Sequence, residues 1–295
     1  MSSSGTPVTF LAMKEIIPYL DANTIIQSTS EIPLLQRFFP RVPLTINTLS
    51  IAPGEVQIDN SIYKFTRLMS WFPREETDCI QISVNGALKQ LLKTRAPVEK
   101  VMNVFLEKVF NKARPVKIGT LLLRTLVTAD IELMVEHVVI GAEEARNSKI
   151  LSKKCLPLKS MESLDWAFGF PKVDCEKLIF PDTRFDQFVN LPYPRAHVRA
   201  LTPGPGFVPP FLMHLLDAWV VYRSLRSNHW SFEIPSTGIY CHFMVAISFL
   251  EALDMEIVNE EYHVTTPNVP GETLKVVCQY ENGLHILHLK FEKAY

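Results

Sequence analysis

Residues 44–65, which read LTINTLSIAPGEVQIDNSIYKF, decide how the first half of the chain is interpreted. Apolar residues lie two apart in the pairs Leu44/Ile46 and Leu49/Ile51, and further apolar residues flank the pair Asp59-Asn60 on both sides. A period of two is typical of a strand with one buried face, and a polar pair between two such runs suits a tight hairpin turn. The stretch therefore predicts a strand followed by a hairpin.

Further strands and helices are predicted after residue 65. Residues 79–84 predict a further strand, which ends at Asn85-Gly86 and completes a small sheet. Residues 97–109 predict a helix, because Val98, Val101 and Phe105 repeat at helical spacing behind a proline that a first turn tolerates. Short apolar runs then predict short strands over 117–123, 161–166, 176–180 and 197–201, with a helix near 143–150.

The C-terminal part opens with a break at Gly204-Pro205-Gly206. Helices are predicted from Pro209-Pro210 to Trp219 and over 242–253, with a strand over 230–234 between them. The last two runs, 273–280 and 284–291, predict a β-hairpin because Asn282-Gly283 separates them. The predicted fold class is α+β or α/β: a short helical cluster, then a small sheet, then an irregular, layered, degenerate repeat-like body. The predicted domains are 1–43, 44–203 and 204–295.

The first forty residues predict two or three short helices with more apolar surface than they can bury among themselves. Covering one end of the α/β body and contacting another protein are equally compatible with this excess. The residues that we expect to bind a partner are Phe10, Met13, Ile17, Leu20, Ile25 and Ile26.

Composition excludes several classes of protein. The 295 residues carry 30 lysines and arginines against 31 aspartates and glutamates, so no global field attracts nucleic acid or an anionic membrane. The N-terminus lacks the basic start and apolar run of a secretory signal, and no apolar stretch is long enough to span a membrane. Five widely spaced cysteines without a C-x-x-C pair favour a reducing compartment. The expected location is intracellular, cytoplasmic or nuclear.

No catalytic, cofactor-binding or metal-binding motif occurs, so we expect no enzyme, no cofactor and no metal. Two alternatives stay open. One is a hydrolase in which Cys155 or Cys241 meets a histidine only in the folded chain, with Cys241 and His242 in one cleft. The weaker one is binding of RNA or DNA by a central basic segment that contains Lys112, Arg114, Lys117, Arg146, Lys149, Lys153, Lys154 and Lys159.

Two stretches resemble a known family. Residues 8–40, VTFLAMKEIIPYLDANTIIQSTSEIPLLQRFFP, together with VPLTINTLSI over 42–51, are similar to the F-box-like opening of the nematode F-box-associated proteins. Residues 215–234, LLDAWVVYRSLRSNHWSFEI, resemble a helix, a tryptophan and a following strand in their C-terminal region. The chain departs from the F-box pattern at its start, where Thr9-Phe10-Leu11 replaces the usual Leu-Pro dipeptide.

The resemblance implies a protein-interaction adaptor. The F-box-like helices would engage the linker subunit of a cullin-type ubiquitin ligase, and the C-terminal region would hold a protein substrate. A degenerate relative that has lost ligase docking is the related possibility, because the Leu-Pro dipeptide is absent. The sequence does not identify the substrate.

Overall fold

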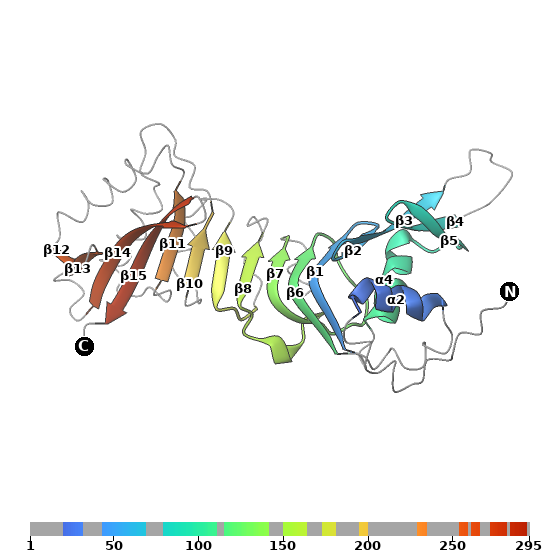
Figure 1. Ribbon diagram of the computed structural model, residues 1–295, viewed down its shortest axis with the longest axis horizontal. Coiled ribbons are helices and arrows are strands. Elements are labelled where there is room, and N and C mark those ends of the chain that lie inside the picture. The colour runs from blue at the N-terminus through green and yellow to red at the C-terminus, as the bar shows by residue number, and fades with distance from the viewer. Residues whose placement is uncertain are drawn as a thin grey trace, which may run out of the picture. The chain divides into compact units, whose positions relative to one another are not determined.

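A computed structural model of the chain describes residues 20–31, 43–68, 79–110, 115–141, 150–163, 173–180, 195–199, 229–234, 254–258, 261–265, 272–281 and 284–293. The chain divides into two compact units. Unit 1 contains Met1–Leu156 and Asp165–Val173, and unit 2 contains Pro157–Leu164 and Asp174–Tyr295. Each unit is built on its own set of paired β-strands (Figure 1).

In unit 1, seven strands lie in the order β7-β6-β1-β2-β3-β4-β5. Strand β6 runs parallel to both β1 and β7, whereas the pairs from β1 to β5 are antiparallel. The strands are β1 (Leu44–Ala52), β2 (Glu55–Ile58), β3 (Ser61–Leu68), β4 (Cys79–Val84), β5 (Ala87–Lys93), β6 (Val116–Leu123) and β7 (Met134–Ile140). The described helices are α2 (Ala22–Glu31), α4 (Val98–Val109) and the short 3-10 helix η4 (Lys153–Cys155).

The hairpin predicted around Asp59-Asn60 is confirmed, since β2 and β3 pair in antiparallel fashion across it. Asp59 has a φ of 48°, a left-handed conformation that aspartate and asparagine tolerate better than most residues. Its Oδ1 atom also accepts the backbone N–H groups of Asn47 and Thr48, both at 2.9 Å. The turn is therefore fastened to β1.

The helix predicted over 97–109 is confirmed as α4, which packs on β3. The ring of Phe105 lies 5.0 Å from that of Tyr63 and 5.4 Å from that of Phe65, between ring centroids. Met102 and Leu106 are fully buried. The apolar stripe of α4 is therefore part of the core of unit 1.

In unit 2, eight strands lie in the order β8-β9-β10-β11-β15-β14-β13-β12. The strands from β8 to β11 are parallel, and the pairs from β11 to β12 in this order are antiparallel. The strands are β8 (Ser160–Ser163), β9 (Lys177–Phe180), β10 (Arg195–Val198), β11 (His229–Ile234), β12 (Asp254–Val258), β13 (Glu261–Thr265), β14 (Glu272–Glu281) and β15 (Leu284–Lys293). The predicted C-terminal hairpin is confirmed as β14 and β15.

One face of the unit 2 strands is apolar and buried. A row of directly paired residues crosses it from β9 to β14, and each is at most 1% exposed. The row consists of Leu178, Ala196, Trp230, Leu289 and Val276. Because side chains alternate across a strand, the residues between them form an opposite, polar face.

The predicted fold class is wrong. The described residues are mostly strands of mixed sheets and include only the two α-helices α2 and α4, not a helical cluster followed by a layered α/β body. The short runs that suggested alternating layers pair with one another instead, as β9, β10 and β11 do. Strands β5, β7, β12 and β13 had not been predicted. The helices predicted near 209–219 and 242–253 lie outside the described residues, as does the helix predicted near 143–150 except for Ile150.

Neither α2 nor α4, the helices of the described part of the chain, has the length and apolar character that a membrane span requires.

Candidate protein-interaction surface

Strand β5 lies at the edge of the unit 1 strands, because it is the end member of their spatial order. It follows β4 through the turn Asn85-Gly86, where both residues have positive φ values of 50° and 81°. A two-residue turn with positive φ at both positions matches the twist of a hairpin and is typically Asn-Gly. On its other side, β5 pairs with no strand of the described part of the chain.

The side chains of β5 are far more exposed than those of a typical sheet strand. All of its residues except the half-buried Leu92 are exposed. Leu88 is 54% exposed and Leu91 is 52% exposed. In β1, by comparison, Leu44, Ile46 and Leu49 are at most 1% exposed. Large apolar side chains on an unpaired edge strand are unusual, because such an edge is a template for association with another chain.

A β-bulge places Leu88 and Leu91 on the same face. Residues three apart in a regular strand point to opposite faces. Here the register shifts between Ile82 and Ser83, so Gln90 pairs with Ile82 but Leu88 pairs with Ser83, and Lys89 is the extra residue. Leu91 pairs with Gln81, two residues from Ser83, and therefore shares the face of Leu88.

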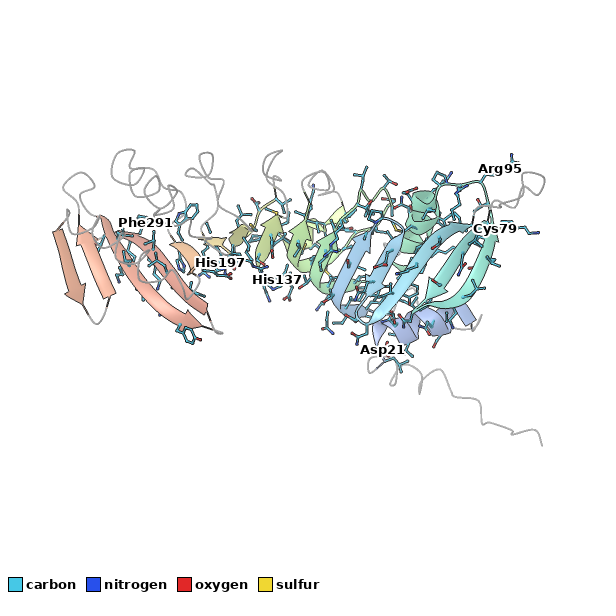
Figure 2. The ribbon with its side chains drawn as sticks, turned by 90° about the horizontal axis from the view of Figure 1, so that it is seen from above. Asp21, Cys79, Arg95, His137, His197 and Phe291 are labelled. Atoms are coloured by element: carbon cyan, nitrogen blue, oxygen red, sulfur yellow. The ribbon has the colours of Figure 1, made fainter. Side chains whose placement is uncertain are left out.

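A third exposed leucine lies on this face. Leu68 in β3 is 41% exposed and pairs with Cys79, which in turn pairs with Lys93. Because directly paired residues share a face, Leu68 faces the same way as Lys93 and Leu91. We call Leu68, Leu88 and Leu91 the edge patch. Figure 2 labels Cys79 and Arg95, which mark this end of unit 1.

The edge patch is bordered by positive charge. Residues 87–95 include Lys89, Lys93 and Arg95 and contain no acidic residue. The guanidinium of Arg67 donates to the backbone carbonyls of Arg95 and Ala96, which holds the segment that leaves β5 in place. The edge is therefore a fixed, cationic and partly apolar strand.

The predicted partner-binding residues lie elsewhere. Ile25 in α2 is 3% exposed and Ile26 is half-buried, as is Leu20, whereas Phe10, Met13 and Ile17 lie outside the described residues. Helix α2 begins after Asp21, whose Oδ1 accepts the backbone N–H of Thr24 at 2.9 Å.

Asn23 fixes α2 to the sheet of unit 1. Its side-chain amide donates to the carbonyl of Ile58 at 2.8 Å and accepts from the hydroxyl of Tyr63 at 3.2 Å. Because α2 is held in this way, Ile25 packs inside this chain. The partner-binding role of the six residues stays a prediction.

Of Cys79, Cys155 and Cys175, whose side chains the structure describes, none hydrogen-bonds to a histidine. Cys155 Sγ lies 2.9 Å from the carbonyl oxygen of Ser152. Burial raises the pKa of Cys175 to about 12, so its thiol is protonated and unreactive at neutral pH. Cys241 and His242 lie outside the described residues. Among the residues that the structure describes, no group of three or more His, Cys, Asp and Glu side chains is arranged to hold a metal ion.

The polar face of unit 2 contains a hydrogen-bonded chain that the sequence did not suggest. His197 Nδ1 lies 2.7 Å from Ser231 Oγ, and His197 Nε2 lies 2.9 Å from Glu233 Oε1. Since a carboxylate accepts, Nε2 carries the proton and Nδ1 accepts from the serine hydroxyl. These are the contacts of a serine nucleophile with its base. However, Ser231 is only 6% exposed, so its hydroxyl has little contact with solvent.

Comparisons of the chain with protein-family models, with curated proteins and with solved structures gave no match. The resemblance to the F-box-associated proteins therefore stays a prediction.

Acidification is expected to destabilise unit 2. Burial lowers the pKa of His197, and burial together with the nearby cations lowers that of His229 to about 4. The unfolded chain protonates these rings near pH 6.5, so the stability they contribute is present above that pH and is lost toward pH 4. Burial raises the pKa of Glu162, so acidification stabilises unit 2 through this carboxyl group. This effect opposes that of the two histidines, but it comes from a single group.

The measurement is the urea midpoint of unit 2 at pH 7 and at pH 5, with pulse proteolysis and mass spectrometry to assign the unfolding unit. His229→Gln should flatten the pH dependence. A urea midpoint that is the same at pH 7 and pH 5 would contradict the expectation. So would a His229→Gln variant whose midpoint depends on pH as strongly as that of the wild type.

Proposed function

We propose that this chain is a protein-interaction adaptor that captures an extended segment of another protein along the open edge of β5. The observation that supports the proposal is the pair Leu88 and Leu91, two half-exposed leucines on one face of an unpaired edge strand. A partner strand would gain main-chain hydrogen bonds from the edge and would bury these leucines against its own alternate side chains. Burying such side chains contributes about 1 kcal/mol each when half of the area is already covered.

The protective features of the edge do not account for the leucines. Lysines and a bulge are common devices that keep edge strands from pairing unselectively, and β5 has both. A strand that only needed protection would carry polar residues at positions 88 and 91. The combination of Leu88 and Leu91 with Lys89 and Lys93 fits a selective edge. Such an edge accepts a segment that has apolar residues and carboxylates, and it rejects a cationic segment.

Synthetic peptides test this selectivity on the full chain. The probes are a proline-capped peptide of alternating valine and glutamate and the same peptide with lysine in place of glutamate. We expect the glutamate peptide to bind at least about tenfold more tightly by fluorescence anisotropy, since three cations border the edge patch. Hydrogen exchange should slow in β5 when the peptide binds.

The double variant Leu88→Asn/Leu91→Asn should weaken the glutamate peptide by about tenfold. Leu126→Asn is the matched control, because Leu126 is as exposed as Leu88, at 54%, but lies outside any strand. An equal loss in the control, or no slowing of exchange in β5, would refute edge capture. A chain that self-associates through β5 in sedimentation, so that a second copy occupies the edge, would also refute it.

The linker subunit of a cullin-type ubiquitin ligase stays the partner predicted from the resemblance. A deletion of residues 1–43 does not test it cleanly, because the deletion removes α2 and with it the contacts of Asn23 to Ile58 and Tyr63. Pull-down of the purified linker subunit with Phe10→Asp/Met13→Asp/Ile17→Asp in the full chain is the suitable test.

A further inference from the structure

A row of basic residues crosses the polar face of unit 2. Each member pairs directly with the next one on the neighbouring strand, from β9 through β10, β11 and β15 to β14 (Figure 1). The row consists of Lys177, Arg195, His229, Lys290 and Lys275, and we call it the basic row. Paired residues share a face, and four strand spacings of about 4.8 Å make the row about 19 Å long.

The basic row faces away from the buried side of the sheet. Its members alternate with the apolar row that contains Trp230 and Leu289. Arg195 is exposed, and the other four residues are half-buried. All five residues are therefore at least partly accessible to solvent.

Placing like charges directly opposite one another across strands destabilises a sheet. The carboxylates on this face do little to neutralise the like charges in the middle of the row. Glu162 pairs with Arg199 at 2.8 Å and Glu233 with His197 at 2.9 Å, and both pairs lie outside the row. Glu292 lies 2.8 Å from Lys275 at one end. Among the described residues, no carboxylate forms an ion pair with Arg195 or Lys290.

The positive potential of the row is visible in its central residue. The pKa of His229 falls to about 4 through burial first, then through His288, Lys290, Arg195 and Lys177. At neutral pH the ring is therefore uncharged, and the positive charge of the row comes from its lysine and arginine residues. A negatively charged ligand along the row would relieve their repulsion.

We propose that the basic row binds the sugar–phosphate backbone of a single-stranded nucleic acid. A linear polyanion can follow one row of cations and pass between the carboxylates of the neighbouring rows. A flat anionic membrane would instead also meet Glu292, which lies in the next row on one side, and Glu233, which lies two rows away on the other side.

An acidic peptide fits the row less well than a nucleic acid. Strands β9, β10, β11 and β15 are paired on both sides, so a peptide crossing them gains no main-chain hydrogen bonds. Phosphate contacts need only side chains. The described side chains of this face include histidine rings but no phenylalanine, tyrosine or tryptophan, so we expect little base preference.

This surface differs from the central basic segment considered in the sequence. Of that segment, only Lys117, Lys153, Lys154 and Lys159 lie within the described residues, and none belongs to the basic row. The row is assembled from five strands whose residues are up to about a hundred positions apart in the sequence, so no local charge run announces it.

The test is fluorescence anisotropy of the full chain with labelled U20 and dT20 at several salt concentrations. The double variant Arg195→Gln/Lys290→Gln should weaken both probes by about tenfold and reduce the slope of log affinity against log salt by about 1.4, as expected for two lost phosphate contacts. The matched control is Lys100→Gln/Lys108→Gln in α4, which removes the same charge at two exposed positions and should stay within about twofold of the wild type.

Arg195→Lys/Lys290→Arg keeps the charges and should retain the affinity, which guards against a folding defect of the double glutamine variant. The inference is overturned if neither probe binds, if the α4 control weakens binding as much as the row variant, or if polyglutamate displaces U20 as effectively as unlabelled U20 does. Because the β5 variants report on peptide capture separately, failure here leaves the proposed adaptor function unaffected.

Discussion

Replacement of Trp230 by alanine is expected to lower the free energy of unfolding of unit 2 by about 3–5 kcal/mol. Trp230 is fully buried in β11, between its paired neighbours Ala196 and Leu289, which are themselves at most 1% exposed. Truncation removes the transfer free energy of the indole ring and leaves a cavity that the surrounding strands cannot close. Unit 2 should lose stability while unit 1 keeps it.

Two substitutions control this result. Trp230→Phe keeps an aromatic ring in the same place and should cost about 1–2 kcal/mol. Tyr280→Ala in β14 removes a side chain that is 67% exposed and should change the free energy of unfolding by less than about 0.5 kcal/mol. Urea titration read out by hydrogen exchange of the β11 and β15 peptides separates unit 2 from unit 1. If Trp230→Ala costs no more than Tyr280→Ala, the apolar face of unit 2 is not a packed core.

Replacement of Asp59 by alanine is expected to destabilise unit 1 by about 2–4 kcal/mol. The carboxylate accepts two backbone N–H groups of β1, from Asn47 and Thr48, and both bonds disappear with it. Hydrogen bonds to a charged group contribute more than neutral ones, and the two donors would be left without this acceptor. In addition, alanine tolerates the φ of 48° less well than aspartate.

Two further variants separate these effects. Asp59→Asn keeps an acceptor and the tolerance for a positive φ, and should cost about 1 kcal/mol. Asp59→Gly relieves the backbone but loses the acceptor, so it should fall between the asparagine and alanine variants. Hydrogen exchange of β1 in urea is the measurement. If Asp59→Gly is as stable as the wild type, the two hydrogen bonds do not contribute to stability. If Asp59→Gly is only as stable as Asp59→Ala, the backbone at residue 59 is unstrained.

The strands that the sequence predicts correctly are those with a local signature. The apolar pairs within 44–51, the polar pair Asp59-Asn60 and the pair Asn282-Gly283 all act within a few residues, so neighbouring side chains decide the outcome. The helix α4 is of the same kind, because its apolar stripe repeats within 12 residues.

Strand β5 shows why other elements escape sequence analysis. Its leucines at positions 88, 91 and 92 have the spacing of a helix, and no alternation marks the segment. Pairing with β4 across the Asn85-Gly86 turn overrides that preference, because β-propensity depends on the neighbouring strand more than on the residue itself. The Asn-Gly pair after residues 79–84 was the available signal for a hairpin partner.

The fold class failed for a related reason. Four-residue runs such as those of β9 and β10 contain too few positions to show which other run they will pair with. They were assigned to layers alternating with helices, whereas they lie beside one another as parallel strands. Long-range pairing between distant runs is not encoded in the period of any one of them.

The sequence alone determines the local hairpins, helix α4 and the balanced charge of the chain, because each depends on residues close in sequence or on composition. The tertiary structure alone decides the candidate surfaces. A bulge turns Leu88 and Leu91 to one face of β5, and strand register brings five basic residues from separate segments into one row. The physical reason is that which side chains share a face depends on register between strands, and register is set by pairing across the sheet.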